Sequence, residues 1–580
     1  MSRPELLPVS SRVSNNPTST LRRQYSAAVY PLICCATVLL CLAIARPFAN
    51  SAFNDDWAYS YVALRFEQTG RLHYSGWGSP MILFQTIWGA AWIHVFGFSF
   101  NVLRVATVPF SLGFVTLVYA LERKLGLEPS VAVFGAIAVG TSPLFLPLAA
   151  SFMTEPYGCF FSTLCLYAAI ATAQTPNRLH ARCWLWVLAL SGILGGSNRQ
   201  VIWAVPLALI PYLWWLRHSD RRFTLHAATA GVSCIASAAF LLAHLSQPYA
   251  PLQLSRAQLF DVAIDNGAIA CALLANLILS GLLAALPAFV CFTPFWKRLG
   301  ILRLSQYSII CATLMAFLVG LFGTRYGLAP FLGNMLTPHG LLNPGEDAVG
   351  NRPVILPIGV RIGITWFLLI SVAAAIRITR SQRFCLERLP LTVVAVFSAS
   401  YIPFLLPGAI VGLVFDRYML PLLPALMIVG LLLVRSASCT VPVSAWLCVL
   451  VLAGYSTATT HDYFSYLRAR VLAARTLECR GIPRREISAG VEYDGWTQLR
   501  LAGTIKPVLY NDDRPGRSTD SFWFWKKAVA VTPRYVISYC APADVPAASI
   551  TTVSIETWLP PRRWAVVAVR RADVGSVLRR

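Results

Sequence analysis

Residues 80–97 read PMILFQTIWGAAWIHVFG, and the way in which this segment meets a membrane decides how the whole chain is threaded. The segment is apolar and eighteen residues long, close to the shortest helix that crosses a hydrocarbon core of about 30 Å. It also contains Trp88, Trp92 and His94, side chains suited to the boundary between lipid and water. If this segment crossed the membrane, every later loop would change sides, so the charges of the other loops decide the question.

The rest of the chain has the composition of a polytopic membrane protein. Of its 580 residues, 56% are hydrophobic and 13% are charged, whereas about a quarter of the residues of a soluble domain are charged. Apolar runs long enough to cross a bilayer recur along the chain. We expect about thirteen membrane spans, at about 27–45, 102–121, 130–150, 156–173, 183–197, 200–216, 223–245, 267–292, 307–323, 359–376, 390–413, 419–434 and 442–458.

Basic residues mark the loops of one side. With the N-terminus in the cytoplasm, the loops predicted to face the cytoplasm contain Arg123, Lys124, Arg178, Arg182, Arg217, Arg221, Arg222, Lys297, Arg298, Arg303, Arg377, Arg380, Arg383, Arg388 and Arg435. The loops of the opposite side are longer but poorer in basic residues, as the positive-inside rule requires. A span at 80–97 would invert this pattern, so we expect that segment to be a helix lying in the outer interface.

The formal net charge of +23 fits the same arrangement. Basic residues in short loops between apolar runs are typical of a protein that faces anionic lipid, so we expect the lipid bilayer as a partner and no nucleic acid. Most of the 15 cysteines lie inside apolar runs or at their ends, where cysteine is a small core residue. Cys479 and Cys540 lie in the C-terminal region, and the sequence leaves open whether they form a disulfide.

These patterns predict an all-α polytopic membrane domain followed by a small α/β domain. The expected parts are a cytoplasmic tail at 1–26, a transmembrane domain at 27–459 with its first outer loop at 46–101, and an extracytoplasmic C-terminal domain at 460–580. The last part begins with a predicted helix at 461–480 and contains strand-like runs at Tyr535–Tyr539 and Trp564–Val569, separated by turn-forming and charged residues.

Two acidic sites fall on the outer side under this topology. Asp55 and Asp56 open the first outer loop, and Glu155 lies in a short outer turn between two spans. Neighbouring carboxylates beside a low-dielectric membrane raise each other's pKa, and such a group serves as a general base toward a hydroxyl or amine. The alternative is that these acids are only solvated residues that flank spans. Both acidic sites fall on the outer side although the topology depends only on the positions of Lys and Arg.

The first outer loop resembles that of membrane glycosyltransferases of the GT-C fold, particularly the bacterial aminoarabinose transferase and protein O-mannosyltransferase branch. The family's motif has an Asp-Glu pair or near equivalent, a Tyr three residues later, interfacial helices and an FG…LR entry into the second span. The matching residues here are Asp55, Asp56, Tyr59, Phe96-Gly97 and Leu103-Arg104, with Asp56 standing where Glu is usual. Thr154-Glu155-Pro156 resembles the family's second acidic site, and Asp416–Pro424 resembles its Arg-Tyr…Pro…Pro element.

The resemblance implies a thirteen-span GT-C membrane domain that transfers a hexose or pentose from a polyprenyl-phosphate donor, generally with inversion. The acceptor would be an extracytoplasmic glycolipid, polysaccharide or protein, and the location would be the bacterial inner membrane. The implied catalytic residues are Asp55, as general base, and Glu155, and the implied substrate-binding residues are Asp56, Tyr59, Arg199, Arg417 and Tyr418. Arg417 is the first choice for the phosphate, because arginine holds phosphate in a bidentate grip; its alternative role is that of an interfacial anchor.

Two alternatives remain open from the sequence. No metal-ligand spacing is visible, but some GT-C enzymes use a divalent cation through acidic loops. The rival function is a transporter or flippase of a lipid-linked saccharide, which needs ionisable residues near the bilayer midplane. Charged residues are scarce inside the predicted spans and collect at the outer rim instead, which favours an enzyme. Trp57, Tyr74 and Trp77 are interpreted as part of an aromatic belt.

Overall fold

The computed structural model describes residues 17–247, 256–292, 306, 310, 335–342, 349–350, 353–381, 388–410, 414–436, 440–505, 528–540, 545 and 549–571. Its α-helices in these ranges are α1 (Pro17–Ala45), α2 (Asp56–Thr69), α3 (Leu83–Phe96), α4 (Phe100–Lys124), α5 (Pro129–Gly140), α6 (Thr154–Gln174), α7 (Arg178–Asn198), α8 (Ala204–Arg217), α9 (Arg221–Leu245), α10 (Arg256–Ala284), α11 (Leu286–Val290), α15 (Ile358–Ser381), α16 (Arg388–Tyr401), α17 (Leu405–Ile410), α18 (Leu423–Ser436), α19 (Val443–Cys479) and α20 (Val491–Ala502). The short 3-10 helices are η1 (Gln200–Trp203), η3 (Ile402–Phe404), η4 (Asp416–Leu422) and η5 (Arg484–Glu486).

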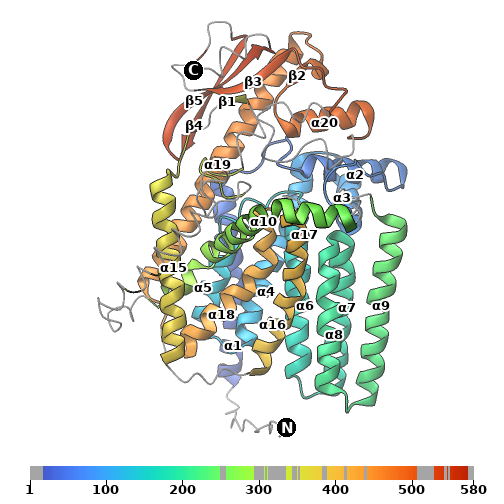
Figure 1. Cartoon of the computed structure of the whole chain (residues 1–580), viewed down its shortest axis with the longest axis vertical. Coiled ribbons are helices and arrows are strands. Elements are labelled where there is room, and N and C mark those ends of the chain that lie inside the picture. The colour runs from blue at the N-terminus through green and yellow to red at the C-terminus, as the bar shows by residue number, and fades with distance from the viewer. Residues whose placement is uncertain are drawn as a thin grey trace.

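The chain is an integral, multi-pass membrane protein. In the described part of the chain, eight helices are long and apolar enough to cross a membrane, and three shorter apolar helices accompany them. These helices stand side by side and form the lower two thirds of the molecule, while the C-terminal sheet lies above them (Figure 1). The predicted span at 307–323 falls almost entirely outside the described residues, so the total of thirteen spans stays a prediction.

Several predicted spans differ from the observed helices. The span expected at 390–413, for example, is divided into α16, η3 and α17. The expected span at 130–150 is wrong as one continuous helix, because α5 ends at Gly140 and residues 141–153 continue as buried turns. Pro143 explains this end, since a proline disfavours helical geometry in the residue before it. The predicted span at 442–458 and the predicted helix at 461–480 are one helix, α19, of 37 residues. At 1.5 Å per residue α19 is about 55 Å long, so it continues from the bundle into the C-terminal domain.

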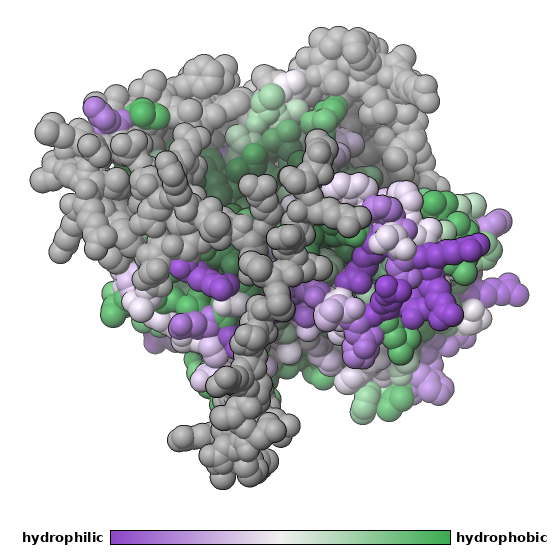
Figure 2. Space-filling model, turned by 90° about the horizontal axis from the view of Figure 1, so that it is seen from below, coloured by the Kyte–Doolittle hydropathy of each residue, from purple (hydrophilic) through white to green (hydrophobic). Residues whose placement is uncertain are grey.

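The basic turns share the lower end of the bundle, as the charge pattern predicts. The α6–α7 and α8–α9 connections both lie there (Figure 1), and hydrophilic side chains gather on this face (Figure 2). An ion pair joins the two connections, with 3.9 Å between Nε of Arg178 and Oδ2 of Asp220. Arg435, near the end of α18, donates to the carbonyl oxygen of Leu125 just beyond α4, so these ends of the two helices also lie together.

Helix α3, the segment that decides the threading, does not run along the bundle. It has 14 residues and is about 21 Å long, less than the thickness of a hydrocarbon core. The amide of Gln85 at its beginning donates to Asn198 at the end of α7. Soon after its last residue, Phe100 opens α4 and contacts Trp496 of the C-terminal region, with 5.1 Å between the ring centroids. Both ends of α3 therefore lie at the upper end (Figure 1).

A small α/β domain covers the upper end of the bundle. Its sheet has five strands, β1 (Val349–Gly350), β2 (Ile487–Ser488), β3 (Tyr535–Cys540), β4 (Thr551–Trp558) and β5 (Pro561–Arg570). The order is β1-β3-β5-β4, with β2 also paired to β3; β1 and β2 run parallel to β3, and β5 runs antiparallel to β3 and β4. The predicted strands at 535–539 and 564–569 are confirmed by β3 and β5. Strand β1 lies between α11 and α15 in the chain, outside the predicted range 460–580.

Three apolar cores hold these parts together. The largest lies within the helix bundle, and a second lies between α19 and the sheet. The third joins the first outer loop to the C-terminal domain around Trp57 of α2 and Leu499 of α20. A Cβ atom added to Gly495 of α20 would lie 2.8 Å from the ring of Trp57, so the two helices are in close contact. Cys479 is exposed, and Cys540 is buried in the sheet.

Candidate active site

Arg417 joins the two acidic sites of the sequence. Its Nη2 lies 3.0 Å from Oδ2 of Asp55, and its Nε lies 3.2 Å from Oε1 of Glu155. Nη1 of Arg199 lies 3.1 Å from the same oxygen of Glu155. The Glu155 and Arg417 side chains are 2% and 6% exposed, whereas that of Asp55 is 19% exposed. Residues from four distant segments thus form a balanced cluster of two guanidinium groups and two carboxylates at the upper end of the bundle.

The carboxylate of Asp55 is held by two donors on different sides. Asp55 directly precedes α2, where its carbonyl oxygen accepts from the amide of Ala58. Its Oδ2 meets Arg417, and its Oδ1 accepts a hydrogen bond of 2.9 Å from Nε1 of Trp77. The sequence predicts that Trp77 belongs to an aromatic belt, whereas the structure places it in the candidate site. Each oxygen retains lone pairs beyond these contacts, so a partly exposed carboxylate with a fixed orientation results.

Glu155 is positioned by the start of α6 and the turn before it. It lies in the first turn of α6, where the partial positive charge of the helix N-terminus stabilises a carboxylate. The side chain of Gln85 donates to the carbonyl oxygen of Phe152 at 2.7 Å. Nδ2 of Asn198 donates to the carbonyl oxygen of Thr154, and Oδ1 of Asn198 accepts from the backbone N–H of Gln85. Helices α3 and α7 therefore fix the turn that carries Glu155.

The neighbours of Arg417 in η4 fix its guanidinium group. The carboxylate of Asp416 accepts from the amides of Met335, Leu336 and Arg417 at 3.0, 2.6 and 2.8 Å. The guanidinium carbon of Arg417 lies 4.9 Å from the ring centroid of Phe415. That of Arg199 lies 4.8 Å from the ring centroid of Tyr418, so Tyr418 supports the second arginine.

Asp56 and Tyr59 have partners of a different kind. The carboxylate of Asp56 is completely buried, accepts from the amide of Phe53 at 2.6 Å and lies 3.7 Å from Nη2 of Arg104. Arg104 also donates to the carbonyl oxygens of Ala49 and Ser51, so this pair holds the entrance of the first loop. Burial raises the pKa of Asp56 to about 7, despite the nearby Arg104.

Tyr59 is buried under the glycine-rich part of the first loop. Its hydroxyl accepts from the amide of Ser79 at 3.3 Å. Gly78 has φ of +85°, and a Cβ atom there would lie 2.7 Å from the Tyr59 ring. Because burial and the negative charges of Asp55 and Glu155 raise the pKa of Tyr59, its hydroxyl stays protonated and serves as a neutral support of the loop.

In the described part of the chain, the carboxylates of the cluster face arginine side chains. Within the described ranges, no three His, Cys, Asp or Glu side chains are grouped as metal ligands. Arg417 lies between the carboxylates of Asp55 and Glu155, so its own positive charge fills the place that a cation would take between them.

Arg417 keeps a donor for a further ligand. Its Nη1 is buried and has no hydrogen-bond partner among the residues that the structure describes. A buried, unsatisfied guanidinium donor is unfavourable unless another group supplies the acceptor. An anionic oxygen next to Nη1 would satisfy this donor within a few ångströms of the Asp55 carboxylate. The geometry therefore places an unsatisfied guanidinium donor beside a partly exposed carboxylate.

No family model and no curated protein matches the chain. Three solved structures are similar. The apo structure of ArnT from Cupriavidus metallidurans is 12% identical to this chain, with a TM-score of 0.34, and the match covers 92% of this chain and 97% of that chain. The structure of ArnT bound to undecaprenyl phosphate is 11% identical, also with a TM-score of 0.34, and the match covers 93% of this chain and 97% of that chain. The protein O-mannosyltransferase Pmt1-Pmt2 complex of S. cerevisiae bound to the sugar donor is 16% identical over 38% of this chain, which spans about a third (33%) of that chain, with a TM-score of 0.31.

Both proteins are GT-C glycosyltransferases, the superfamily that the first-loop motifs resemble. TM-scores of 0.31 and 0.34 are too low for these likenesses to carry the function of this chain. The function has to be argued from the cluster itself.

Proposed function

We propose that this chain is a membrane glycosyltransferase that moves a sugar from a polyprenyl-phosphate donor to an acceptor on the outer side of a bacterial inner membrane. The observation that carries the proposal is the buried Arg417, which bridges Asp55 and Glu155 and keeps Nη1 without an acceptor in the described structure. A phosphate supplies such an acceptor, and the apolar surface of the bundle suits the polyprenyl chain that carries it.

Arg417 and Arg199 would bind the phosphate of the donor. In the transfer step the bond between the anomeric carbon and the phosphate oxygen breaks, and the electron pair leaves with the lipid phosphate. Guanidinium groups fixed before the reaction stabilise this charge better than water does, because they need no reorganisation. Glu155 contacts both arginines, so we assign it a positioning role rather than a direct contact with the sugar.

Asp55 would activate the acceptor. Its carboxylate takes the proton of the acceptor hydroxyl or amine, while that oxygen or nitrogen forms the new bond to the anomeric carbon on the face opposite the phosphate. This displacement inverts the anomeric configuration. Trp77 and Arg417 fix the two carboxylate oxygens of Asp55, which matters because proton transfer requires a base within hydrogen-bond reach of the acceptor.

Asp56, Tyr59 and Tyr418 would act through the loop and the arginines. Asp56 with Arg104 holds the start of the first loop, and Tyr59 supports the segment around Gly78. Tyr418 lies against Arg199. These contacts favour support of the site over direct contact with substrate for all three side chains.

The experiment that tests the function uses the purified full-length chain in liposomes. It is incubated with radiolabelled hexoses and pentoses linked to polyprenyl phosphate, and with the same sugars linked to nucleotides. We expect release of polyprenyl phosphate and transfer of label to an added glycolipid, polysaccharide or protein fraction, with no turnover of the nucleotide sugars. Movement of the intact lipid-linked saccharide across the bilayer without cleavage would favour the transporter instead and refute the proposal.

A further inference from the structure

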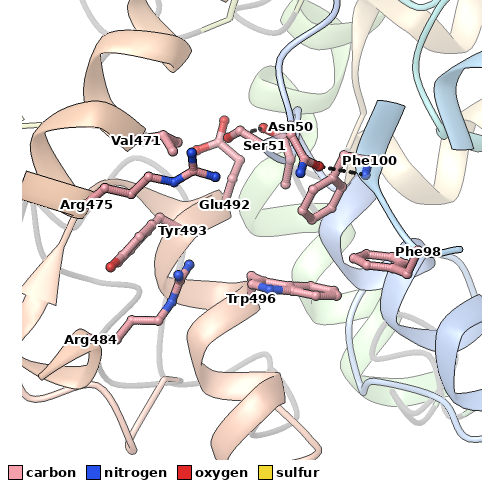
Figure 3. Close-up of a pocket in the computed structure, with 11 residues that line it drawn as sticks. Asn50, Ser51, Phe98, Phe100, Val471, Arg475, Arg484, Glu492, Tyr493 and Trp496 are labelled. Carbon is pink, nitrogen blue, oxygen red and sulfur yellow. Dashed lines mark hydrogen bonds between the residues drawn. The ribbon is translucent and has the colours of Figure 1, made fainter. Parts of the chain in front are cut away.

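A second site lies between the C-terminal domain and the first outer loop. It is a pocket with a volume of about 200 Å³, and its lining residues (Figure 3) are not those of the cluster around Arg417. Its walls come from the loop at 50–52, from the turn between α3 and α4, and from α19, η5 and α20. Pockets for drug-sized ligands have volumes of about 300–1,000 Å³, so this one suits a group of about the size of a single sugar ring.

One wall of the pocket is aromatic. The rings of Phe98 and Trp496 are nearly parallel, with 4° between their planes and 5.2 Å between their centroids. Phe100 meets Trp496 edge to face at 5.1 Å. A flat aromatic surface of this kind packs against the C–H face of a sugar ring while the hydroxyl groups stay free for polar contacts.

The charges of the pocket are predominantly positive. Glu492 is already neutralised by Arg470 at 2.8 Å and accepts from the hydroxyl of Tyr463 at 2.6 Å. Arg484 packs over Tyr493 and has only a partly exposed ion pair with Glu478 at 3.3 Å. Arg475 points into the pocket (Figure 3) and forms no ion pair with any residue in the described part of the chain. A ligand that brings a negative charge would therefore complete the pocket.

The pocket is joined to the candidate base by a short, rigid piece of chain. Asn50 and Ser51 line the pocket, and Asp55 follows Asn50 by five positions. The distance between them is at most about 18 Å along an extended chain. The Asp56–Arg104 pair fixes this segment from below, because Arg104 also donates to the carbonyl oxygen of Ser51. An oligosaccharide of a few units could reach from the pocket to Asp55.

We propose that this pocket binds an acidic sugar unit of the acceptor, one that carries a carboxylate or a phosphate. The aromatic wall takes the ring, and Arg475 with Arg484 takes the anion. A neighbouring unit of the same acceptor then presents its hydroxyl or amine to Asp55. This inference rests on the proposed function, since it assigns the acceptor class to the same enzyme. It makes the C-terminal domain a device for selecting anionic acceptors.

The test measures binding without any sugar donor. Full-length protein in nanodiscs is titrated with the methyl glycosides of glucuronic acid, of glucose 6-phosphate and of glucose, and binding is measured by calorimetry. The variants are Arg475→Gln, which changes an exposed side chain of the pocket, and Arg563→Gln, which changes an exposed arginine on β5 as a matched control. The integrity of each variant is checked by its unfolding temperature.

We expect at least one acidic glycoside to bind about tenfold more tightly than the neutral one. Arg475→Gln should remove most of this difference, and Arg563→Gln should leave it unchanged. The acidic glycoside that binds identifies the anion as carboxylate or phosphate. Equal binding of all three glycosides, no saturable binding of either acidic one, or an unchanged affinity in Arg475→Gln would overturn the proposal. Because no donor is present, that result would leave the transfer assay, and hence the proposed function, standing on its own.

Discussion

At the scale of single residues, Arg417 combines contacts that a single side chain can make only if it is an arginine. Its Nε contacts Glu155, its Nη2 contacts Asp55, and its Nη1 remains for a ligand. A lysine has a compact ammonium group and cannot reproduce this planar, three-sided arrangement. In the function that we propose, the geometry of the guanidinium group, and not only its charge, links anion binding to the orientation of the base.

Substitution of Arg417 by lysine should reduce sugar transfer by about a hundredfold or more, since the loss of one preorganised donor at a developing anion has an effect of that size. The measurement is the single-turnover rate with a polyprenyl-phosphate sugar. Arg435→Lys, at the opposite end of the bundle where Arg435 donates to Leu125, is the control and should keep nearly the wild-type rate. Equal rates in wild type and Arg417→Lys would contradict the role given to the guanidinium group.

The buried Asp56 gives the protein a measurable dependence of stability on pH. Burial raises the pKa of Asp56 from 3.8 to about 7. Between these values the folded protein keeps a proton that the unfolded chain releases, so stability falls as the pH rises from about 4 to about 7 and is then constant. The full pKa shift changes the free energy of unfolding by about 4 kcal/mol between the two ends of this pH range.

In Asp56→Asn this titration is absent. The unfolding temperature of wild type relative to Asp56→Asn should therefore decrease between about pH 4 and pH 7 and stay level above pH 8. The measurement is thermal unfolding of both proteins in the same detergent at several pH values. A wild-type protein that gained stability over this interval, relative to the variant, would show that Arg104 dominates over burial.

Much of the cluster could be predicted from the sequence at this scale, but not all of it. The bias of Lys and Arg among loops and the first-loop motif placed Asp55, Glu155 and Arg417 on the same side. The hydrogen bond from Trp77 to Asp55 could not be predicted, because a tryptophan in an aromatic belt and one that orients a carboxylate look alike in sequence. The pairing of Asp56 with Arg104 depends on the fold of residues 49–56 against α4, which has no local signal.

At the scale of helices and strands, the contact between α2 and α20 connects the candidate base to the C-terminal domain. Asp55 directly precedes α2, and α20 lies against the same helix through Gly495 and Trp57. Any change that moves α20 away from α2 should disturb the loop that carries Asp55.

Gly495→Ala tests this contact. The new Cβ would lie 2.8 Å from the Trp57 ring, and overpacking of this kind is destabilising by about 1–3 kcal/mol. We expect faster proteolysis of the C-terminal domain and a lower transfer rate. Gly454→Ala in α19, where nothing lies within 4 Å of the added Cβ, should behave as wild type or slightly better, because alanine favours helix. Identical proteolysis of both variants would rule out a functional contact.

Sequence patterns identified most helices but misjudged where some of them end. Hydropathy extends over 130–150 without a break, whereas Pro143 ends α5 early and leaves a buried turn after Gly140. Hydropathy falls after residue 458, but α19 continues to Cys479, since packing against the sheet replaces lipid as its environment. The end of α5 has a local cause that hydropathy alone overlooks, whereas the end of α19 depends on burial by other parts of the chain, which a local pattern does not reveal.

At the scale of the whole molecule, the two ends of the bundle differ in their charged residues. The basic α6–α7 and α8–α9 turns lie at the lower end, whereas α2 lies at the upper end below the C-terminal domain (Figure 1). Asp55 directly precedes α2, and Arg417 joins it to Glu155. We propose that the lower end faces the cytoplasm, in accord with the positive-inside rule.

Cysteine labelling in intact cells tests this orientation. Cys479 is exposed and free at the end of α19, so a membrane-impermeant maleimide should label it from outside. The label should disappear in Cys479→Ser. Ser219→Cys, introduced into that variant in the α8–α9 turn, should react only after the cells are permeabilised. The reverse pattern of labelling would place the candidate site in the cytoplasm.

The central claim is that the carboxylate of Asp55 removes the acceptor proton while Arg417 and Arg199 hold the donor phosphate. The most direct measurement is the single-turnover rate of sugar transfer in Asp55→Asn, together with the affinity of the same sample for the polyprenyl-phosphate donor. Asparagine keeps the shape of the side chain but accepts no proton at this position, so we predict a rate lower by about a hundredfold to ten-thousandfold and an affinity for the donor within a few fold of wild type. A transfer rate equal to that of wild type would show that Asp55 is not the base.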